Sequence, residues 1–355
     1  MPIRLEHTLT LVCMMVSIIG CQPDPEPEPP SGSARAHFAP TEITLKEVAE
    51  TGLKELLDHR LTFTDSSGRK WTAPRGTLTD GASVPRYALA VSDGRFDEKF
   101  LKAAVVHDAY CQDINEDRCS KQYRTTSWRE VHRMFYNGCL VGHTPELRAK
   151  IMFAAVWLFG PRWDDPKAEV NELPEDARLI GLSGSMNWIE ENNPNIEDIE
   201  SDLEKREPLL GELYKHEQKA QSAIQKKQWK KAKKAISQQQ ARLAAALKDS
   251  PQDLMLLNFK GNAHKNKAVI YRTSDIRGDA DKELHNAEKA FNKVLDDQKA
   301  DPVALKGMGG VSFARGDLRS AKKYMDDAIR VAPNFGAAKH ERDLINRLEK
   351  RKPKK

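Results

Sequence analysis

The chain has 355 residues, enough for two or three domains, and its 57 basic and 52 acidic side chains leave a net charge of only +5. A charge this close to balance gives no argument for nucleic acid, which is therefore not among the expected partners. Five cysteines are too few for a disulfide-rich scaffold in a chain of this length.

The first twenty residues have the pattern of an export signal. Arg4 supplies a positive charge, and the segment 9–19 is mostly apolar but short for a membrane span. The sequence IIGC at 18–21 resembles the bacterial lipobox, in which the cysteine is acylated, for example with palmitate, and becomes the mature N-terminus. This resemblance implies a lipoprotein signal peptide and a membrane anchor on Cys21. A transmembrane anchor and a cleaved secretory peptide are the alternatives.

The segment 21–40 begins with QPDPEPEPPSGS after the cysteine, a proline-rich composition that favours a disordered tether. Gln22, where other lipoproteins have aspartate, resembles lipoproteins sent to the outer membrane. We therefore expect a lipid-anchored protein of the bacterial cell envelope, in the outer membrane and facing the periplasm.

Export also places the remaining cysteines in an oxidising compartment. Cys111 and Cys119 lie on either side of a short polar loop, and we predict a disulfide between them. Cys139 would then be a buried thiol. A bridge from Cys111 to Cys139 is the alternative, because sequence alone does not determine connectivity.

The segment 41–165 has the pattern of a small α+β domain. Apolar residues over 42–58 recur at helical spacing and predict one amphipathic helix. A strand-rich patch with a turn at 65–68 comes next. Four apolar residues alternate with polar ones in this patch: Leu61, Phe63, Trp71 and Leu78.

Two helical segments between 100 and 139 each place a histidine on their apolar side. His107 lies four residues after Ala103, and His132 lies three residues before Phe135. If the two helices pack together, both imidazoles point into the same space. A polar group buried there needs a partner, a water molecule or a metal ion.

A third helix is predicted over 145–159, where an apolar stripe starts at a proline and ends at Gly160-Pro161. Beyond the domain, 166–208 is predicted to be a connector with short helices. The segment 209–349 has long helices rich in alanine, lysine, glutamine and leucine, and 350–355 is a basic tail.

Residues 302–333 resemble a tetratricopeptide unit, with small and bulky residues at the expected positions and Gly316 at the turn between two helices. Weaker copies upstream bring the total to about three units, the minimum for a stable stack. The resemblance implies a helical array with a groove that binds a protein or peptide partner. A bare spacer and a homodimer surface are the alternatives.

The N-terminal domain resembles a bacterial and phage family, the domain of unknown function 1353, over about residues 60–163. Four blocks in order carry the resemblance: TDGASVP at 79–85, AVVHD at 104–108, VHRMFY at 131–136 and FGPRW at 159–163. The family name implies no activity. His132 stands where many members have aspartate, and Cys111 stands where an aromatic residue often follows the His-Asp pair.

A helix with adjacent histidine and aspartate that faces a second helix is also similar to secreted phospholipase A2. That likeness implies His107 as a general base and Asp108 as a calcium ligand, with Asp80-Gly81 in the place of the calcium loop. The orienting carboxylate of that arrangement falls at His132.

Three interpretations compete for these residues. In the first, His107 is a general base whose tautomer Asp80 or Asp108 determines. In the second, His107, His132 and one or both of Asp108 and Asp80 hold a divalent metal, with zinc, manganese or iron favoured over calcium. In the third, the group is a buried polar network without a reaction. The first two predict a histidine- or metal-dependent hydrolase domain beside a protein-binding repeat domain. The alternative is a non-catalytic scaffold lipoprotein that recruits a protein partner through its groove.

Overall fold

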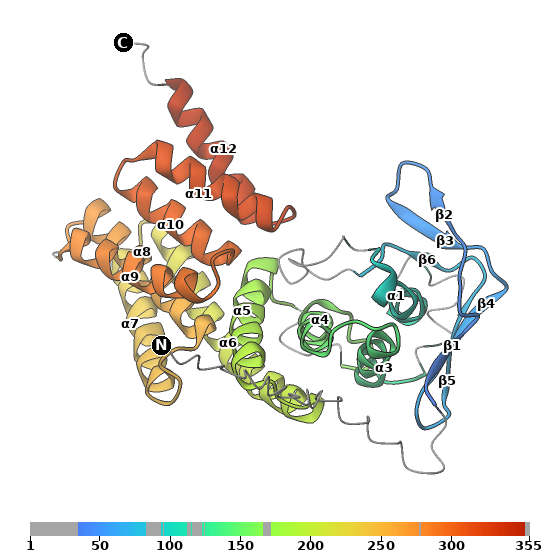
Figure 1. The fold of residues 1–355 in the computed structure, drawn as a ribbon. Helices are drawn as coiled ribbons and strands as arrows, with labels where there is room; N and C mark the ends of the chain where they lie inside the picture. The colour runs from blue at the N-terminus through green and yellow to red at the C-terminus, as the bar shows by residue number, and fades with distance from the viewer. Residues whose placement is uncertain are drawn as a thin grey trace, which may run out of the picture. The chain divides into compact units, whose positions relative to one another are not determined.

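The computed structural model describes residues 35–82, 94, 96–111, 115, 123, 125–165, 172–276 and 278–351. These residues form two small sheets and three helices, followed by a long run of helices (Figure 1). This is the predicted α+β domain followed by an all-helical part. The predicted signal peptide, acylated Cys21, most of the tether, Cys119 and the last residues of the basic tail lie outside the described residues.

Within the described ranges, none of the helices combines the length and the apolar character that a membrane span needs.

The N-terminal strands form two antiparallel sheets of three strands each. The predicted alternation is confirmed at Leu61, Phe63 and Trp71, which are buried, and Phe63 pairs with Trp71 across the first sheet. It is wrong at Leu78, which is half-buried between the buried Thr77 and Thr79. The strand order is β1 (His37–Ala39), β4 (Arg60–Thr64), β5 (Lys70–Pro74) in the first sheet, and β2 (Leu45–Val48), β3 (Leu53–Leu56), β6 (Leu78–Thr79) in the second.

The predicted helix over 42–58 is wrong, because this segment forms the β2–β3 hairpin. Leu45 pairs with Leu56, and the turn contains Gly52 at a φ of 71°. A left-handed φ is incompatible with a continuous helix and is easiest for glycine. The spacing of the apolar residues is compatible with a helix or with a hairpin, and the turn at Gly52 is compatible only with the hairpin.

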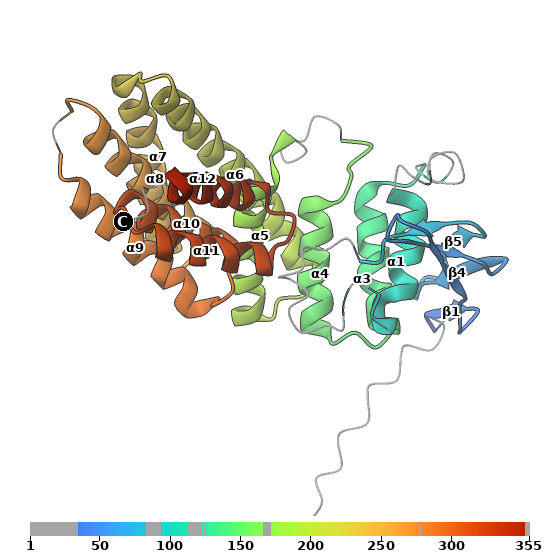
Figure 2. The same ribbon diagram turned by 90° about the horizontal axis from the view of Figure 1, so that it is seen from above.

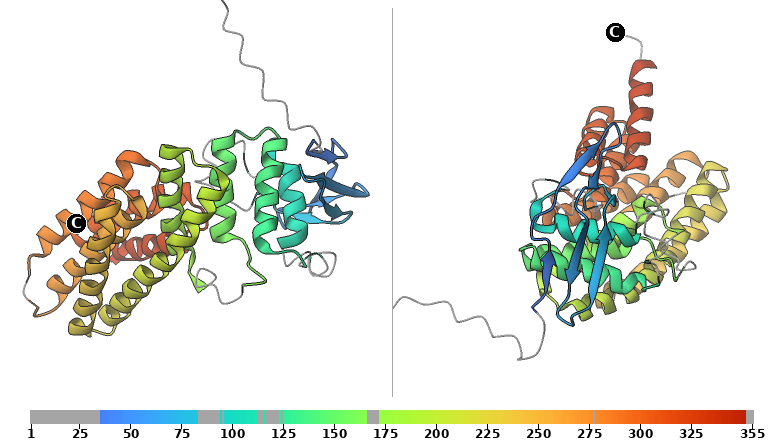
Figure 3. Two further views of the ribbon diagram at one scale, coloured as in Figure 1. Left: turned by 90° about the horizontal axis from the view of Figure 1, so that it is seen from below. Right: turned by 90° about the vertical axis from the view of Figure 1, so that its right-hand side faces the viewer.

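Three helices cover one side of the strands, and all three are predicted correctly. They are α1 (Glu98–Cys111), α3 (Trp128–Val141) and α4 (Glu146–Phe159). Ser127 caps α3 in a capping box with Glu130. Helix α1 packs between the strands and α3, and α3 packs against α4 (Figures 2 and 3).

In the described part of the predicted connector, residues 172–208, the structure has long helices in place of the predicted short ones. Helix α5 (Glu175–Asn192) is long and mostly buried, and α6 (Ile196–Gln225) begins inside this segment and continues through Pro208. Pro174 and Pro194 lie just before the two helices, so prolines that suggested a broken connector mark helix starts instead.

The remaining helices pack mainly as consecutive pairs, as a helical repeat requires. The predicted turn in 302–333 is present, with Gly316 at a φ of 84° and Asp317 capping the next helix. Helix α5 packs on α6, α8 and α10. The helices are α7 (Trp229–Asp249), α8 (Leu254–Thr273), α9 (Ala280–Asp297), α10 (Pro302–Ala314), α11 (Leu318–Val331) and α12 (Gly336–Arg351).

Candidate metal centre

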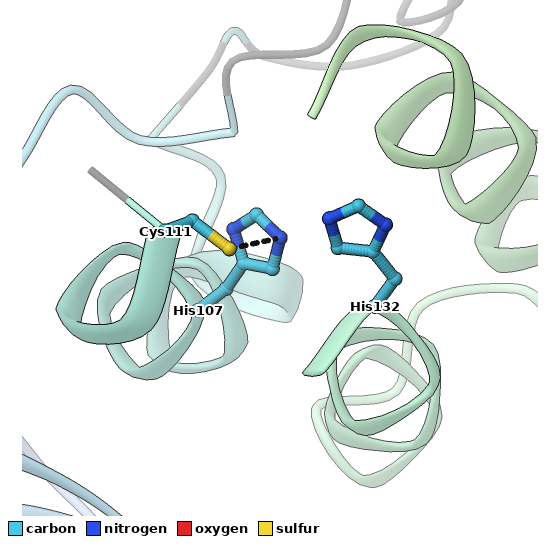
Figure 4. A group of neighbouring side chains, drawn as sticks. All are labelled: His107, Cys111 and His132. Atoms are coloured by element: carbon cyan, nitrogen blue, oxygen red, sulfur yellow. Dashed lines mark hydrogen bonds between the residues drawn. The ribbon is translucent and has the colours of Figure 1, made fainter. Parts of the chain in front are cut away.

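The two histidines face each other across the contact between α1 and α3. Their ring centroids are 5.3 Å apart, and one ring nitrogen of His132 points toward the His107 ring (Figure 4). The prediction that both imidazoles enter one space between the helices is therefore confirmed. It follows from helical periodicity, because each histidine lies on the side of its helix that packs against the other.

Cys111 joins the histidines from the next turn of α1. Its Sγ lies 3.3 Å from Nε2 of His107, and both residues are buried. One ligand atom from each of His107, Cys111 and His132 can be chosen so that all three lie within 4.8 Å of one another. Among the described residues, these three side chains form a group of potential metal ligands.

Asp108, which the sequence predicts as a ligand, lies behind His107 rather than among these three atoms. Its Oδ1 is 3.6 Å from Nδ1 of His107, and its Oδ2 accepts a 2.5 Å hydrogen bond from the Thr79 hydroxyl. Burial raises the pKa of Asp108 to about 6, and the nearby charge of Asp80 adds to the increase. Asp80, in the loop that follows β6, thus contributes to the raised pKa of Asp108.

His132 is the least satisfied polar group of the site. Its side chain is fully buried, and neither ring nitrogen has a hydrogen-bond partner among the described residues. Burial holds the pKa of His132 well below its usual value, and the charges of His107 and Arg162 lower it further. The ring is therefore neutral, with a lone pair available on one nitrogen.

The groups around His107 favour a positive charge on its ring. Burial alone would lower the pKa of His107, but the charges of Cys111 and Asp108 outweigh it and raise the pKa to about 10. An imidazole that keeps its proton at neutral pH is a poor general base. With the Cys111 sulfur beside Nε2 of His107 and the His132 ring facing it, the geometry suits a cation in the place of that proton.

A small pocket of about 100 Å³ opens beside the cluster. One wall is the loop after β6, at Gly81 and Ala82, and another is the end of α4 at Phe159 and Gly160. Of the predicted loop 79–85, residues 79–82 are described, and Ser83 and the residues after it lie outside the described part. A volume of this size has room for a few water molecules.

Sequence reasoning missed several residues that shape the site. A Cβ atom on Gly160 would lie 2.6 Å from Nε2 of His132, so only glycine lets the chain pass this close to the ring. Asn115 joins β6 to α1, because its amide accepts from Leu78 N–H and donates to the carbonyls of Leu78 and Asp108. Gly160 lies in one of the four sequence blocks, and that position was a usable signal.

The cysteine predictions are resolved in part. Cys111 and Cys139 do not form a disulfide with each other. Burial raises the pKa of the Cys139 thiol, which favours the neutral form. Because Cys119 lies outside the described residues, the disulfide between Cys111 and Cys119 stays a prediction.

The fold and the site define a small α+β domain with a buried His–Cys–His cluster, linked to an array of helices. The family model described as "Protein of unknown function (DUF1353)" matches residues 56–156, so this part of the chain is similar to that family. The described residues from 172 onward form a helical, repeat-like region outside that match.

Two curated relatives come from Sinorhizobium fredii (strain NBRC 101917 / NGR234), and both are described as uncharacterized. The protein y4jT is 35% identical over 117 residues, which are 33% of this chain and 32% of the relative. The protein y4iH is 35% identical over 109 residues, which are 31% of this chain and 41% of the relative. The chain thus spans less than half the length of these relatives. No solved structure matches.

Proposed function

We propose that this chain is a lipid-anchored protein of the bacterial cell envelope whose DUF1353 domain is a metal-dependent hydrolase. One observation carries the catalytic part of the proposal. His107 and His132 converge beside a pocket of about 100 Å³, and Asp108 lies behind the first of them. The IIGC sequence before the tether supports the anchor at Cys21.

A divalent cation between the two imidazoles would supply acidity to a water molecule in the pocket. In hydrolysis, the water oxygen bonds to the acyl or phosphoryl centre, the bond to the leaving group breaks, and a proton passes from the water to the leaving group. His107 and His132 would hold the cation, and Asp108, with Oδ1 3.6 Å from Nδ1 of His107, would orient that ring. Phe135 and Phe159 contribute apolar walls that limit the access of bulk water.

The substrate class follows from the proposed location. An anchored domain on a short tether reaches membrane lipid and peptidoglycan, so we propose an envelope ester or amide as substrate. The helical array is proposed to bind a protein or peptide partner. Because α5 already packs on α6, α8 and α10, this partner would use the surface that α5 leaves open.

The test uses the full-length chain purified in detergent. It is incubated with mixed micelles of bacterial phospholipid and, separately, with purified peptidoglycan, and released fatty acids and muropeptides are measured by mass spectrometry. We expect release from one substrate, and a drop of about 100-fold or more in His107→Asn and His132→Asn, because each variant removes a proposed ligand.

His143→Asn is the matched control, since His143 is exposed, lies outside the pocket and has a left-handed φ of 63° that asparagine tolerates. It should retain the activity of the parent chain. Absence of release from both substrates, or equal rates in the parent and both site variants, would contradict the hydrolase proposal.

A further inference from the structure

We infer that Cys111 is the third protein ligand of the proposed metal and that the metal is zinc, bound by His107, Cys111 and His132. This inference rests on the proposed function only in placing a metal ion at this site. It replaces the predicted carboxylate ligand with a thiolate, and that replacement changes which metals the site selects.

The geometry of α1 supports the ligand set. His107 and Cys111 are four residues apart on one helical face, a spacing that places two ligands side by side. Their ligand atoms are already 3.3 Å apart, and the third atom lies within 4.8 Å. A tetrahedral zinc ion holds two nitrogen atoms and one sulfur atom about 3.3 to 3.6 Å apart. The most widely separated ligand atoms therefore have to approach one another by about 1 Å.

The second and independent support is His132. An imidazole that is fully buried with two unpartnered nitrogens costs free energy unless something satisfies it. One of those nitrogens faces the His107 ring (Figure 4). A metal ion that also contacts Cys111 would satisfy this nitrogen.

The chemistry of the donors selects the metal. Two imidazoles and a thiolate suit zinc, whereas magnesium, calcium and manganese prefer oxygen ligands. Among the described residues, the carboxylate next to the cluster is that of Asp108, which is directed to Thr79 and to Nδ1 of His107. Next to Nδ1, Asp108 positions the His107 ring and does not bind the metal, as in the carboxylate–histidine–zinc arrangement. Three protein ligands leave a fourth position for water, as in catalytic zinc sites.

The experiment measures metal content and cobalt spectra of the full-length chain, purified in detergent without chelator. We expect about one zinc ion per chain, as in other sites with three protein ligands, and its loss in Cys111→Ser and His132→Asn. After replacement of zinc by cobalt, the parent chain should show a near-ultraviolet thiolate-to-cobalt charge-transfer band. Cys139→Ala is the matched control, because Cys139 is equally buried but outside the cluster, and it should retain both zinc and the band.

The cobalt spectrum of the parent chain does not depend on any variant remaining folded. Absence of the band, retention of zinc in Cys111→Ser, copper in place of zinc, or a Cys111–Cys119 disulfide in the metal-loaded chain would each overturn the inference. Bound zinc with the band but without hydrolysis would support the ligand set and contradict the proposed function. Hydrolysis that needs both histidines but not Cys111 would support the proposed function and contradict the ligand set.

Discussion

At the scale of single residues, close approach of the backbone is as important as the ligands themselves. Gly160 ends α4, and its backbone lies against the ring of His132. The ring is held from its other sides by aromatic contacts, including Trp128 at 5.3 Å between centroids. His132 therefore has little freedom to move away from an added group.

Gly160→Ala should destabilise the domain. The new Cβ would lie 2.6 Å from Nε2 of His132 and 2.4 Å from the carbonyl oxygen of Val156, so one of them must shift, at a cost of about 1–3 kcal/mol. The measurement is the urea midpoint followed by tryptophan fluorescence.

Gly336→Ala is the control, because a Cβ on Gly336 would meet no atom within 4 Å. It should leave the midpoint almost unchanged. Equal midpoints for the two variants would show that the close approach at Gly160 is not a constraint.

At the scale of elements, α6 contacts both the helices of the N-terminal domain and the helices that follow. Glu207 on α6 accepts hydrogen bonds from Arg162 and from Trp157 Nε1. Glu200 forms a two-point ion pair with Arg133 of α3. The Arg162 side chain is only 1% exposed, and the carboxylate of Glu207 provides its counter-charge.

Glu207→Gln should lower the free energy of unfolding by about 3 kcal/mol, because it leaves the Arg162 guanidinium buried without a counter-charge. Glu204→Gln, one turn earlier, is the matched control. Glu204 pairs with Arg129, but both side chains are about half exposed, so its loss should cost less than about 1 kcal/mol. Chemical denaturation measures both, and a similar cost for the two variants would contradict the importance of burial here.

At the scale of the whole molecule, a buried carboxylate in the helical array makes stability depend on pH. Burial raises the pKa of Glu217 on α6 to about 7, although the charges of Lys265 and Lys306 oppose the increase. A raised pKa means that the folded state binds the proton more tightly than the unfolded state. Its stabilising contribution is complete below about pH 4.5 and is lost as pH rises through 7.

Glu217→Gln removes this dependence, because glutamine is uncharged at every pH. The variant should match the parent chain near pH ~4 and exceed its unfolding free energy at pH ~8 by up to about 3 kcal/mol. Urea midpoints at the two pH values measure the effect. Glu212→Gln, on the same helix but partly exposed, should show no such gain. A Glu217→Gln difference that is equal at both pH values would contradict this assignment.

The sequence by itself determined the three helices of the N-terminal domain and the faces on which they pack. Helical periodicity placed His107 and His132 on packing sides, and alternation placed Phe63 in a buried strand. These are local properties, because a side chain's direction depends on the residues within one or two turns of it.

Only the tertiary structure decided which atoms meet. Residues 42–58 have a spacing that suits a helix or a hairpin, and pairing with β6 accompanies the hairpin. The sequence shows Cys111 only beside a short loop, and the folded chain places its sulfur beside His107. Distances, burial and pKa values depend on segments far apart in the chain, such as α1, α3 and the end of α4. Local patterns carry no information about these separations, so the His–Cys–His cluster required the folded chain.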